Sequence, residues 1–446
     1  MSKRSSFGSK FGMLAAAVGS AVGLGNIWKF PYVAGENGGG AFLIVYILCV
    51  ILLGFPALIT ELSIGRAGDA NPVSAFSTIH GNRRWNFIGA MGVLAAFLTL
   101  GFYFVVAGWS LEYMVQSVTT NAFDGMDVAA LEQGFSDFST ASVRPYIWMA
   151  VFVFITGFVI FFGVQKGIEA GSKILMPLLF AVIFFLVIRA LFIPGSGAGY
   201  EFHLKPDFSK ITPTVILQAM GQAFFSLSIG FGIMLTYGSY MKQGNVVTTS
   251  IQICVLDTMI AFMAGLVIFP AVFAYGIQPN QGPTLAFFTL PAVFSQMPGG
   301  MLFSTLFFFL LAVAALTSTI SLYEAVVVTV SELAHISRRL AIIIIGALLL
   351  ITATLCCHSL TGDSPFIFGG TSLFDLFDNF TSNLLLPLGG FFMAVFLGWI
   401  VPKDKVRETL TGFGMSEKFF PVYLFFVRIF VPIIVLLILL QQLGIL

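Results

Sequence analysis

Charged residues are scarce in this sequence. Only 9% of its 446 residues are Asp, Glu, Lys or Arg, whereas 58% are hydrophobic. Soluble domains carry roughly 25% charged residues, so most of this chain must face lipid or other apolar helices. The formal net charge of +1 also provides no basic surface, which excludes nucleic acid as a partner. The composition therefore predicts a membrane protein.

Cysteine and histidine are also few. The four cysteines lie in or at the ends of apolar runs and lack metal-ligand spacing, so we interpret them as packing residues: Cys49, Cys254, Cys356 and Cys357. The four histidines lie in loops or at segment ends, without a paired carboxylate motif: His80, His203, His335 and His358. An intramembrane enzyme needs a nucleophile with a base, or a metal cluster. We therefore predict that the chain is not an enzyme.

Long apolar runs fill nearly the whole chain. About 20 predominantly apolar residues span a bilayer as a helix, and eleven such windows occur, near 11–35, 41–64, 87–118, 145–163, 168–192, 213–240, 246–276, 301–330, 340–358, 375–400 and 420–442. No room remains for a separate soluble domain. The sequence predicts an all-α membrane protein with eleven transmembrane helices in a single domain, 1–446.

The distribution of Lys and Arg predicts the orientation in the membrane. With a cytoplasmic N-terminus, most of them fall in inner loops, as Arg66, Arg83 and Arg84 do, whereas the 120–143 connection holds acidic residues and no Lys or Arg. An odd number of spans then puts the C-terminus outside. We predict a multi-pass protein of the cell (inner) membrane.

Two apolar segments are interrupted at mid-length by glycine and small polar residues. The interruptions are GSAVGLGN at 19–26 and SLSIGFG at 226–232. Unwound backbone at membrane depth is tolerated only where protein or a water-filled cavity satisfies it, although small residues also serve ordinary helix packing. Breaks five segments apart predict an inverted five-plus-five repeat, with a binding site between the breaks. Its halves are 11–192 and 213–400, and 420–442 is an additional helix.

Four motifs carry a resemblance to a known family. They are GSAVGLGNIWKFPYVAGENGGGAF at 19–42, GQAFFSLSIGFG at 221–232, TLPAVFSQMPGG at 289–300 and ALTSTISLYE at 315–324. Together they resemble the neurotransmitter:sodium symporter family, and within it the bacterial transporters of the leucine-transporter type, some of which have eleven helices. The resemblance implies a sodium-coupled secondary symporter that imports an amino acid by alternating access, with the first and sixth helices broken.

The resemblance also implies a substrate site. The carboxylate is expected at the backbone of Leu24 and Gly25 and at the Tyr103 hydroxyl, because free N–H groups at a helix N-terminus suit an anion. Gly23 stands where monoamine-transporting relatives carry an Asp, so the substrate must bring its own carboxylate. The remaining expected contacts, to the ammonium and to an apolar or aromatic side chain, are Ala21, Thr99, Phe225, Ser226, Ser228, Phe231, Ser318 and Leu322.

Two sodium ions are implied in the same way. Sodium needs oxygen ligands, which buried hydroxyls, amides and unwound carbonyls supply. The first ion is expected at Ala21, Asn26, Ser226 and Asp257, and the second at Gly19, Val22, Ala314, Thr317 and Ser318. Any one of these hydroxyls could instead bond back to its own helix. Ala261 replaces a serine that helps to bind chloride in many animal members, and Asp257 adds a fixed negative charge, so we predict that chloride is not required.

Charged residues flank this expected site on both sides. By resemblance, Lys29 and Asp378 form an outer gate, and Arg4 and Glu332 form an inner gate. Glu61 is expected to accept a hydrogen bond from unwound backbone, and Glu324 to join a water or backbone network below the ions. Buried carboxylates in apolar segments are costly and so functional by default.

Alternatives remain open at this point. A small ω-amino acid or a betaine-like osmolyte is a second substrate class, and a sensor of the same fold that binds an amino acid without transporting it is a second function. A channel is disfavoured because selectivity filters normally come from symmetric repeats around a pore. The sequence leaves open which amino acid binds, the sodium stoichiometry, proton antiport and the oligomeric state.

Overall fold

The protein is a bundle of long helices, seen here in a computed structural model that describes residues 6–119, 126, 128–279, 285–295, 299–362, 364–442 and 445. Ten helices in this part of the chain are long and apolar enough to cross a membrane. The sixth predicted segment supplies an eleventh span in two short pieces, α11 and α12. The chain is therefore a multi-pass membrane protein, as the sequence predicts.

The elements follow the predicted windows closely. In the first half they are α1 (Lys10–Ala21), η1 (Gly25–Lys29), α2 (Phe30–Glu36), α3 (Gly40–Cys49), η2 (Val50–Gly54), α4 (Phe55–Gly68), α5 (Ser74–His80), η3 (Arg83–Trp85), α6 (Asn86–Thr119), α7 (Val128–Ser139), α8 (Arg144–Phe161), η4 (Val164–Glu169), α9 (Ala170–Ala190), α10 (Gly197–Leu204) and η5 (Phe208–Lys210).

The second half continues in the same manner. Its elements are α11 (Pro213–Ser226), α12 (Ile233–Tyr240), α13 (Val246–Ala274), α14 (Leu285–Ser295), α15 (Gly300–Leu333), α16 (Arg338–His358), β1 (Ile367–Phe368), β2 (Thr371–Ser372), α17 (Leu373–Phe380), η7 (Thr381–Leu385), α18 (Leu386–Val395), η8 (Phe396–Ile400), α19 (Lys403–Gly412), α20 (Phe420–Phe425), η9 (Phe426–Phe430) and α21 (Val431–Gln442). Strands β1 and β2 form a short antiparallel hairpin.

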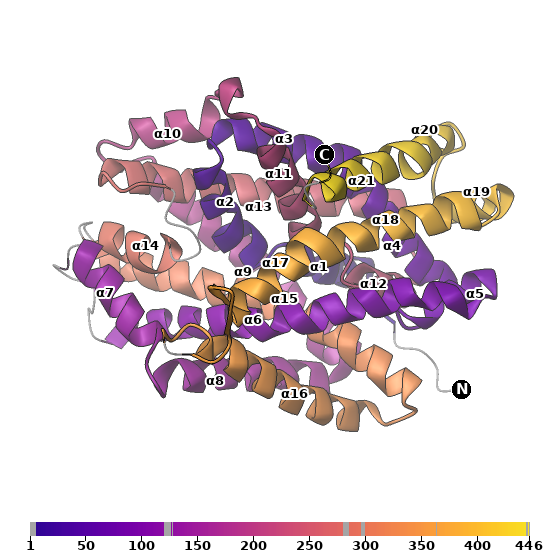
Figure 1. Ribbon diagram of the computed structural model, residues 1–446, viewed down its shortest axis with the longest axis horizontal. Helices are drawn as coiled ribbons and strands as arrows, with labels where there is room; N and C mark the ends of the chain where they lie inside the picture. Colours follow the sequence, from indigo (N-terminus) through magenta and orange to yellow (C-terminus); the bar gives the residue numbers. More distant parts are fainter. Residues whose placement is uncertain are drawn as a thin grey trace.

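Short helices cap the two ends of the bundle. Figure 1 shows α7, α10 and α14 at one end of the molecule, and α5 and α19 at the other. The two longest helices, α6 and α15, run side by side through the centre. The bundle thus has two distinct ends, and α5 and α19 mark the end with the predicted inner loops.

Both predicted helix breaks are present at mid-span. The first lies at residues 22–24, between α1 and η1, and the second at residues 227–232, between α11 and α12. In the second break, Gly230 and Gly232 have φ values of 89° and 75°, the left-handed region that favours glycine. The Ser228 hydroxyl donates a hydrogen bond to the carbonyl of Ser20 at 2.9 Å. This bond joins the backbone beside one break to a side chain in the other.

The carboxylate of Glu61 in α4 supports the second break. It accepts a hydrogen bond from the backbone N–H of Gly230 at 3.1 Å, and its side chain is fully buried. Unwound backbone in an apolar bundle must find partners within the protein. The prediction that Glu61 binds unwound backbone is therefore confirmed.

Candidate functional site

A small cavity lies between the two breaks. It is lined by residues of both broken helices, α6 and α15: Ser20, Ala21, Gly25, Thr99, Tyr103, Phe225, Ser228, Phe231, Ser318 and Leu322. Nine of the residues predicted to bind substrate are in this set. Leu24 and Ser226 are absent from the lining itself, but both are buried directly behind it. Ser20 belongs to the lining although the sequence interpretation did not select it from the 19–26 run.

Backbone donors of the first break meet the Tyr103 hydroxyl. The N–H of Leu24 donates to the Tyr103 oxygen at 2.9 Å, and Tyr103 is only 2% exposed. A Cβ atom added at Gly23 would lie 2.0 Å from the Ser318 hydroxyl oxygen and 2.9 Å from that of Tyr103. No side chain fits at position 23 without movement of these groups, so the break presents bare backbone to the cavity.

Part of the cavity lining is aromatic and aliphatic. The rings of Phe225 and Phe231 meet edge to face, with centroids 5.9 Å apart, and Leu322 lies beside them on α15. A concave site with mostly apolar walls and a few fixed polar groups is typical of a small-molecule site. The cavity lining thus combines backbone and hydroxyl groups with apolar side chains.

A fully buried carboxylate lies behind the first break. Asp257 of α13 is 0% exposed, and its Oδ1 accepts a hydrogen bond from the Asn26 amide at 2.7 Å. Its Oδ2 accepts from the hydroxyls of Tyr46 and Ser226, both at 2.9 Å. Three of the predicted ligands of the first ion, namely Asn26, Ser226 and Asp257, are therefore in direct contact.

The donor set around Asp257 fits a hard cation. Its atoms are carboxylate, amide, hydroxyl and carbonyl oxygens, which such cations prefer. The Gln222 amide nitrogen donates to the carbonyl of Gly25 at 2.6 Å, whereas its own carbonyl oxygen is buried without a partner among the described residues. A sodium ion here would be held by oxygens of Asn26, Ser226, Asp257 and Ala21.

The second predicted ion set joins α1 to α15. Gly19 and Val22 flank the end of α1, and Ala314, Thr317 and Ser318 lie on α15, which packs against it. The Ser318 hydroxyl donates to the Ser20 carbonyl at 3.4 Å, which ties the two helices together. The Thr317 hydroxyl donates to the carbonyl of Ala314 at 3.0 Å, within its own helix. Its lone pairs remain available to a cation, so this oxygen-only set also fits sodium.

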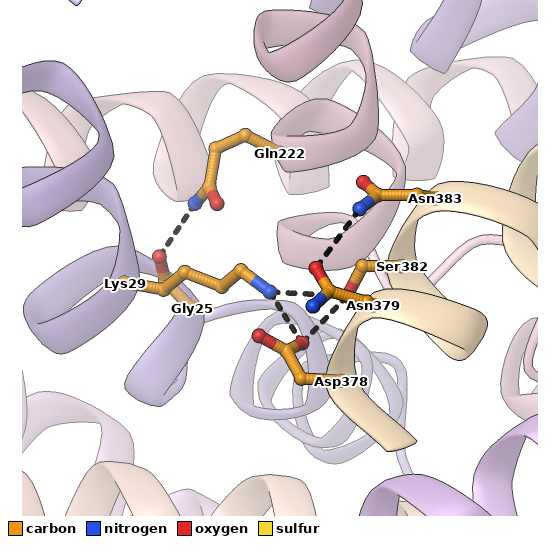
Figure 2. A network of polar contacts seen from close by, with 7 residues as sticks. All are labelled: Gly25, Lys29, Gln222, Asp378, Asn379, Ser382 and Asn383. Carbon is orange, nitrogen blue, oxygen red and sulfur yellow. Dashed lines mark hydrogen bonds and ion pairs between the residues drawn. The ribbon is translucent and has the colours of Figure 1, made fainter. Parts of the chain in front are cut away.

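An ion pair covers the cavity on the side of α17. Figure 2 shows the Lys29 ammonium beside the Asp378 carboxylate, and their closest atoms are 2.5 Å apart. Lys29 also donates to the Ser382 hydroxyl at 3.0 Å and lies 4.4 Å above the centroid of the Phe225 ring. We call Lys29, Phe225, Asp378 and Ser382 the outer cluster. Ser382 was not selected from the sequence, although it follows Asp378 by one helical turn.

A second cluster covers the opposite side. The Arg338 guanidinium binds both carboxylate oxygens of Glu324, at 2.8 and 2.5 Å, and the Tyr240 hydroxyl donates to the same carboxylate at 2.6 Å. Phe7 packs edge to face on the ring of Tyr240, with centroids 6.0 Å apart. We call Phe7, Tyr240, Glu324 and Arg338 the inner cluster.

The partner of Glu324 corrects a prediction. We expected this carboxylate in a water or backbone network, but a guanidinium from the next helix binds it. Arg338 lies at the first turn of α16, and nothing in the sequence indicated that the turn between α15 and α16 folds its side chain back onto Glu324.

Of the predicted inner ion pair, the structure describes only Glu332. Glu332 lies near the end of α15, and its carboxylate accepts hydrogen bonds from the backbone and the side-chain amide of Asn71, at 3.1 and 2.9 Å. Arg4, its predicted partner, lies outside the described residues. The four cysteines are buried free thiols, as their interpretation as packing residues requires.

Comparisons with known proteins agree with this fold. The model of the sodium:neurotransmitter symporter family matches residues 4–124 and 122–445. An uncharacterized sodium-dependent transporter of Bacillus subtilis, YhdH, is 39% identical over 98% of this chain and 97% of its own. An uncharacterized sodium-dependent transporter of Haemophilus influenzae is 34% identical over 99% of this chain and 98% of its own.

A solved structure gives the same result for the fold. The crystal structure of MhsT in complex with L-phenylalanine superimposes with a TM-score of 0.93 at 37% identity, and the alignment covers 100% of both chains. The matches extend through both helix breaks and all the elements that line the cavity. The chain belongs to the sodium:neurotransmitter symporter family, whose members are sodium-dependent secondary transporters.

Proposed function

We propose that this chain is a sodium-coupled symporter that imports an α-amino acid with an apolar or aromatic side chain. One observation carries the proposal. At the first break, Gly23 has no side chain, and the N–H of the next residue, Leu24, donates to the Tyr103 hydroxyl beside the cavity. These groups suit a carboxylate, and the rings of Phe225 and Phe231 suit an apolar side chain. The phenylalanine bound to MhsT supports this substrate class.

The proposed ammonium contacts lie at the second break. They are the carbonyls of Ala21, Phe225 and Ser226 and the hydroxyl of Ser228, and α11 ends at Ser226. The Phe225 carbonyl already accepts a bond from the N–H of Ser228 at 3.1 Å, and its second lone pair is the one proposed to face the ammonium. Carbonyl oxygens facing a cation are favourable at a helix C-terminus. Thr99, Ser318 and Leu322 complete the proposed side-chain pocket.

Two sodium ions supply the proposed coupling. One bridges the substrate carboxylate to Asn26, Ser226, Asp257 and the carbonyl of Ala21, and so binds more tightly when substrate is present. The other, at Gly19, Val22, Ala314, Thr317 and Ser318, holds α1 against α15. Charge neutralisation by a cation is what makes a buried carboxylate such as Asp257 tolerable in an apolar bundle.

The proposed cycle alternates access through the two clusters. The cavity volume of about 20 Å³ is room for roughly one water molecule, so an amino acid enters only when the walls move apart. We assign the outer cluster to the extracellular gate. The inner cluster and Glu332, with Arg4, form the cytoplasmic gate. This assignment rests on the predicted cell-membrane location, with the N-terminus inside and the C-terminus outside.

A substrate panel tests the proposal. Purified protein is heated with each amino acid, with γ-aminobutyrate and with glycine betaine, in sodium and in potassium buffers. A ligand stabilises the folded protein by mass action, so an apolar or aromatic α-amino acid should raise the melting temperature in sodium only. Stabilisation by betaine or γ-aminobutyrate alone would favour the alternative substrate class. Counterflow in proteoliposomes separates a transporter from a sensor, because only a transporter exchanges internal for labelled external substrate.

Chloride independence is a further part of the proposal. The hydroxyls of Tyr46 and Ser226 donate to the Asp257 carboxylate. That negative charge makes an added anion unnecessary and repels it. Uptake should persist when gluconate replaces chloride at fixed sodium, and Asp257→Asn should make uptake respond to chloride. A wild-type rate that collapses without chloride contradicts this argument.

A further inference from the structure

Two spans are joined by a reciprocal pair of hydrogen bonds near one end of the bundle. The Arg428 side chain, in η9, donates from Nε to the carbonyl of Gly398 at 2.5 Å. The Trp399 side chain, in η8, donates from Nε1 to the carbonyl of Arg428 at 2.9 Å. A side chain of each helix therefore donates a hydrogen bond to a backbone carbonyl of the other helix.

Proline explains why both carbonyls accept a side chain. In an α-helix the carbonyl of residue i accepts from the N–H of residue i+4. For Gly398 that residue is Pro402, and for Arg428 it is Pro432. Proline has no N–H to donate, so neither carbonyl can accept the usual i+4 bond. Gly398 also lies two residues before its helix ends at Ile400, where carbonyls lack helical donors. The bonds from Arg428 and Trp399 supply a donor to each carbonyl and fix both side chains between the two spans.

This arrangement holds a positive charge within a membrane span. Arg428 lies eight residues after the start of the span Phe420–Leu440, a rise of about 12 Å. No carboxylate of the described residues forms an ion pair with it, and its two terminal amino groups have no protein hydrogen-bond partner there. A charged side chain in a span is costly and normally pairs with something.

The surroundings of Arg428 are partly exposed on the outer surface of the helix bundle. Its side chain is half-buried, and the guanidinium carbon lies 5.8 Å from the ring centroid of Trp399, which is 62% exposed. Tryptophan is enriched where a membrane meets water. Helix α19, with Lys403 at its start, follows η8 and lies with α20 at one end of the bundle (Figure 1). A long arginine side chain in a span extends its charged group towards the nearer interface, which for Arg428 is the end with α19.

We propose that Arg428 and Trp399 form a binding site for an anionic glycerophospholipid in the leaflet next to α19. The terminal amino groups of Arg428 bind the lipid phosphate, for which a guanidinium fork has matching geometry. The Trp399 ring packs on the upper acyl chains and glycerol. Basic pockets between transmembrane helices are a recurring form of lipid headgroup recognition. The lipid supplies the counter-charge that the described protein does not.

Brominated lipids test the site directly. The full chain is reconstituted in vesicles of phosphatidylcholine with one-quarter phosphatidylglycerol, and bromine is placed either on the phosphatidylglycerol or on an equal fraction of the phosphatidylcholine. The fluorescence of Trp399 is obtained by subtracting that of the Trp399→Phe variant. An attraction of the size expected for one Arg at an anionic surface predicts about five-fold higher occupancy of this site by phosphatidylglycerol, hence stronger quenching by brominated phosphatidylglycerol.

Matched variants separate a specific site from general charge attraction. Arg428→Gln keeps an N–H group for the Gly398 carbonyl but removes the charge, and should abolish the preference. Arg339 is an exposed arginine at the start of α16, and its guanidinium lies over the ring of Phe161. Arg339→Gln removes this charge and should leave the lipid preference intact. Inorganic phosphate added to vesicles of phosphatidylcholine alone should not change Trp399 fluorescence, since the site needs the whole lipid.

Several results overturn the proposal. Equal quenching of wild-type Trp399 by the two brominated lipids contradicts the proposal, whether or not Arg428→Gln folds. A preference for phosphatidylglycerol that survives Arg428→Gln also contradicts it, because the charge of Arg428 is then irrelevant. A response to inorganic phosphate at the level of the lipid response assigns Arg428 to free phosphate instead.

Discussion

The outer and inner clusters lie on two sides of the same cavity, and they differ in the number of bonds that their ion pairs make. The outer cluster rests on one ion pair, from Lys29 to Asp378, whose side chains are 9% and 17% exposed. In the inner cluster, the Glu324 carboxylate is 0% exposed, binds Arg338 through both oxygens and accepts a third bond from Tyr240. A two-oxygen pair around a buried carboxylate is stronger and more directional than a single contact to an ammonium. The outer side should therefore open at lower cost than the inner side.

Breaking the inner cluster should have the largest effect. Arg338→Ala leaves the Glu324 carboxylate buried without its counter-charge, a change that typically costs about 3 to 5 kcal/mol. We expect a large fall in melting temperature and a shift towards the inward-open form. Thermal unfolding and labelling of a cysteine introduced at Ser20 from the cytoplasmic side measure these two effects.

A neighbouring arginine provides the control for that experiment. Arg339→Ala removes an exposed guanidinium on the same helical turn and should change neither the melting temperature nor the labelling. If Arg338→Ala behaves like Arg339→Ala, the inner cluster does not hold that side closed.

The cavity between the clusters gives the next largest effect. Tyr103→Phe removes the hydroxyl beside the N–H of Leu24 and should weaken binding of every substrate by about 1.5 to 3 kcal/mol, the usual size of a hydrogen bond to a charged group. Substitutions at Phe231 should instead change the order of preference among substrates. Binding isotherms for a series of amino acids distinguish the two, and equal effects on all substrates at both positions would falsify the assignment of the two ends of the substrate.

The outer cluster should show the smallest energetic effect. Lys29→Ala removes a single-contact ion pair and a cation–π contact, but the Asp378 carboxylate left behind is 17% exposed and keeps its bond from Ser382. The cost should therefore be smaller than the loss expected for Arg338→Ala. The rate of transport should fall more than equilibrium binding, because Lys29 lies above the cavity and outside its lining. Lys29→Arg should restore the rate, since Arg keeps the charge. A loss of binding equal to the loss of transport contradicts the role of a gate.

The sequence predicted the spans and both breaks because composition encodes them directly. A run of 20 apolar residues and a Gly-rich interruption are local signals, and the windows agree with the helices to within a few residues at most ends. The family resemblance predicted nine of the lining residues, seven of them within the four motifs. These features depend on short stretches of chain, which a single sequence displays.

The residues that the sequence missed depend on contacts between distant segments. Arg338 reaches Glu324 only because the turn after α15 folds α16 back along it, and Ser382 reaches Lys29 across 353 positions. Arg428 was unremarkable in the sequence because Pro402 and Pro432 acquire their meaning only when η8 and η9 lie side by side. The boundaries of the inverted repeat, 11–192 and 213–400, stay a prediction, as do the oligomeric state and the sodium stoichiometry.

Sodium-driven uptake tests the central proposal most directly. Purified protein in proteoliposomes is given labelled phenylalanine or leucine, with an inward gradient of sodium, potassium or choline. We expect saturable accumulation with sodium alone, and its loss in Asn26→Ala, which removes an oxygen ligand beside Asp257. Equal accumulation in potassium or choline would contradict the account, because the two oxygen sites would then have no part in transport.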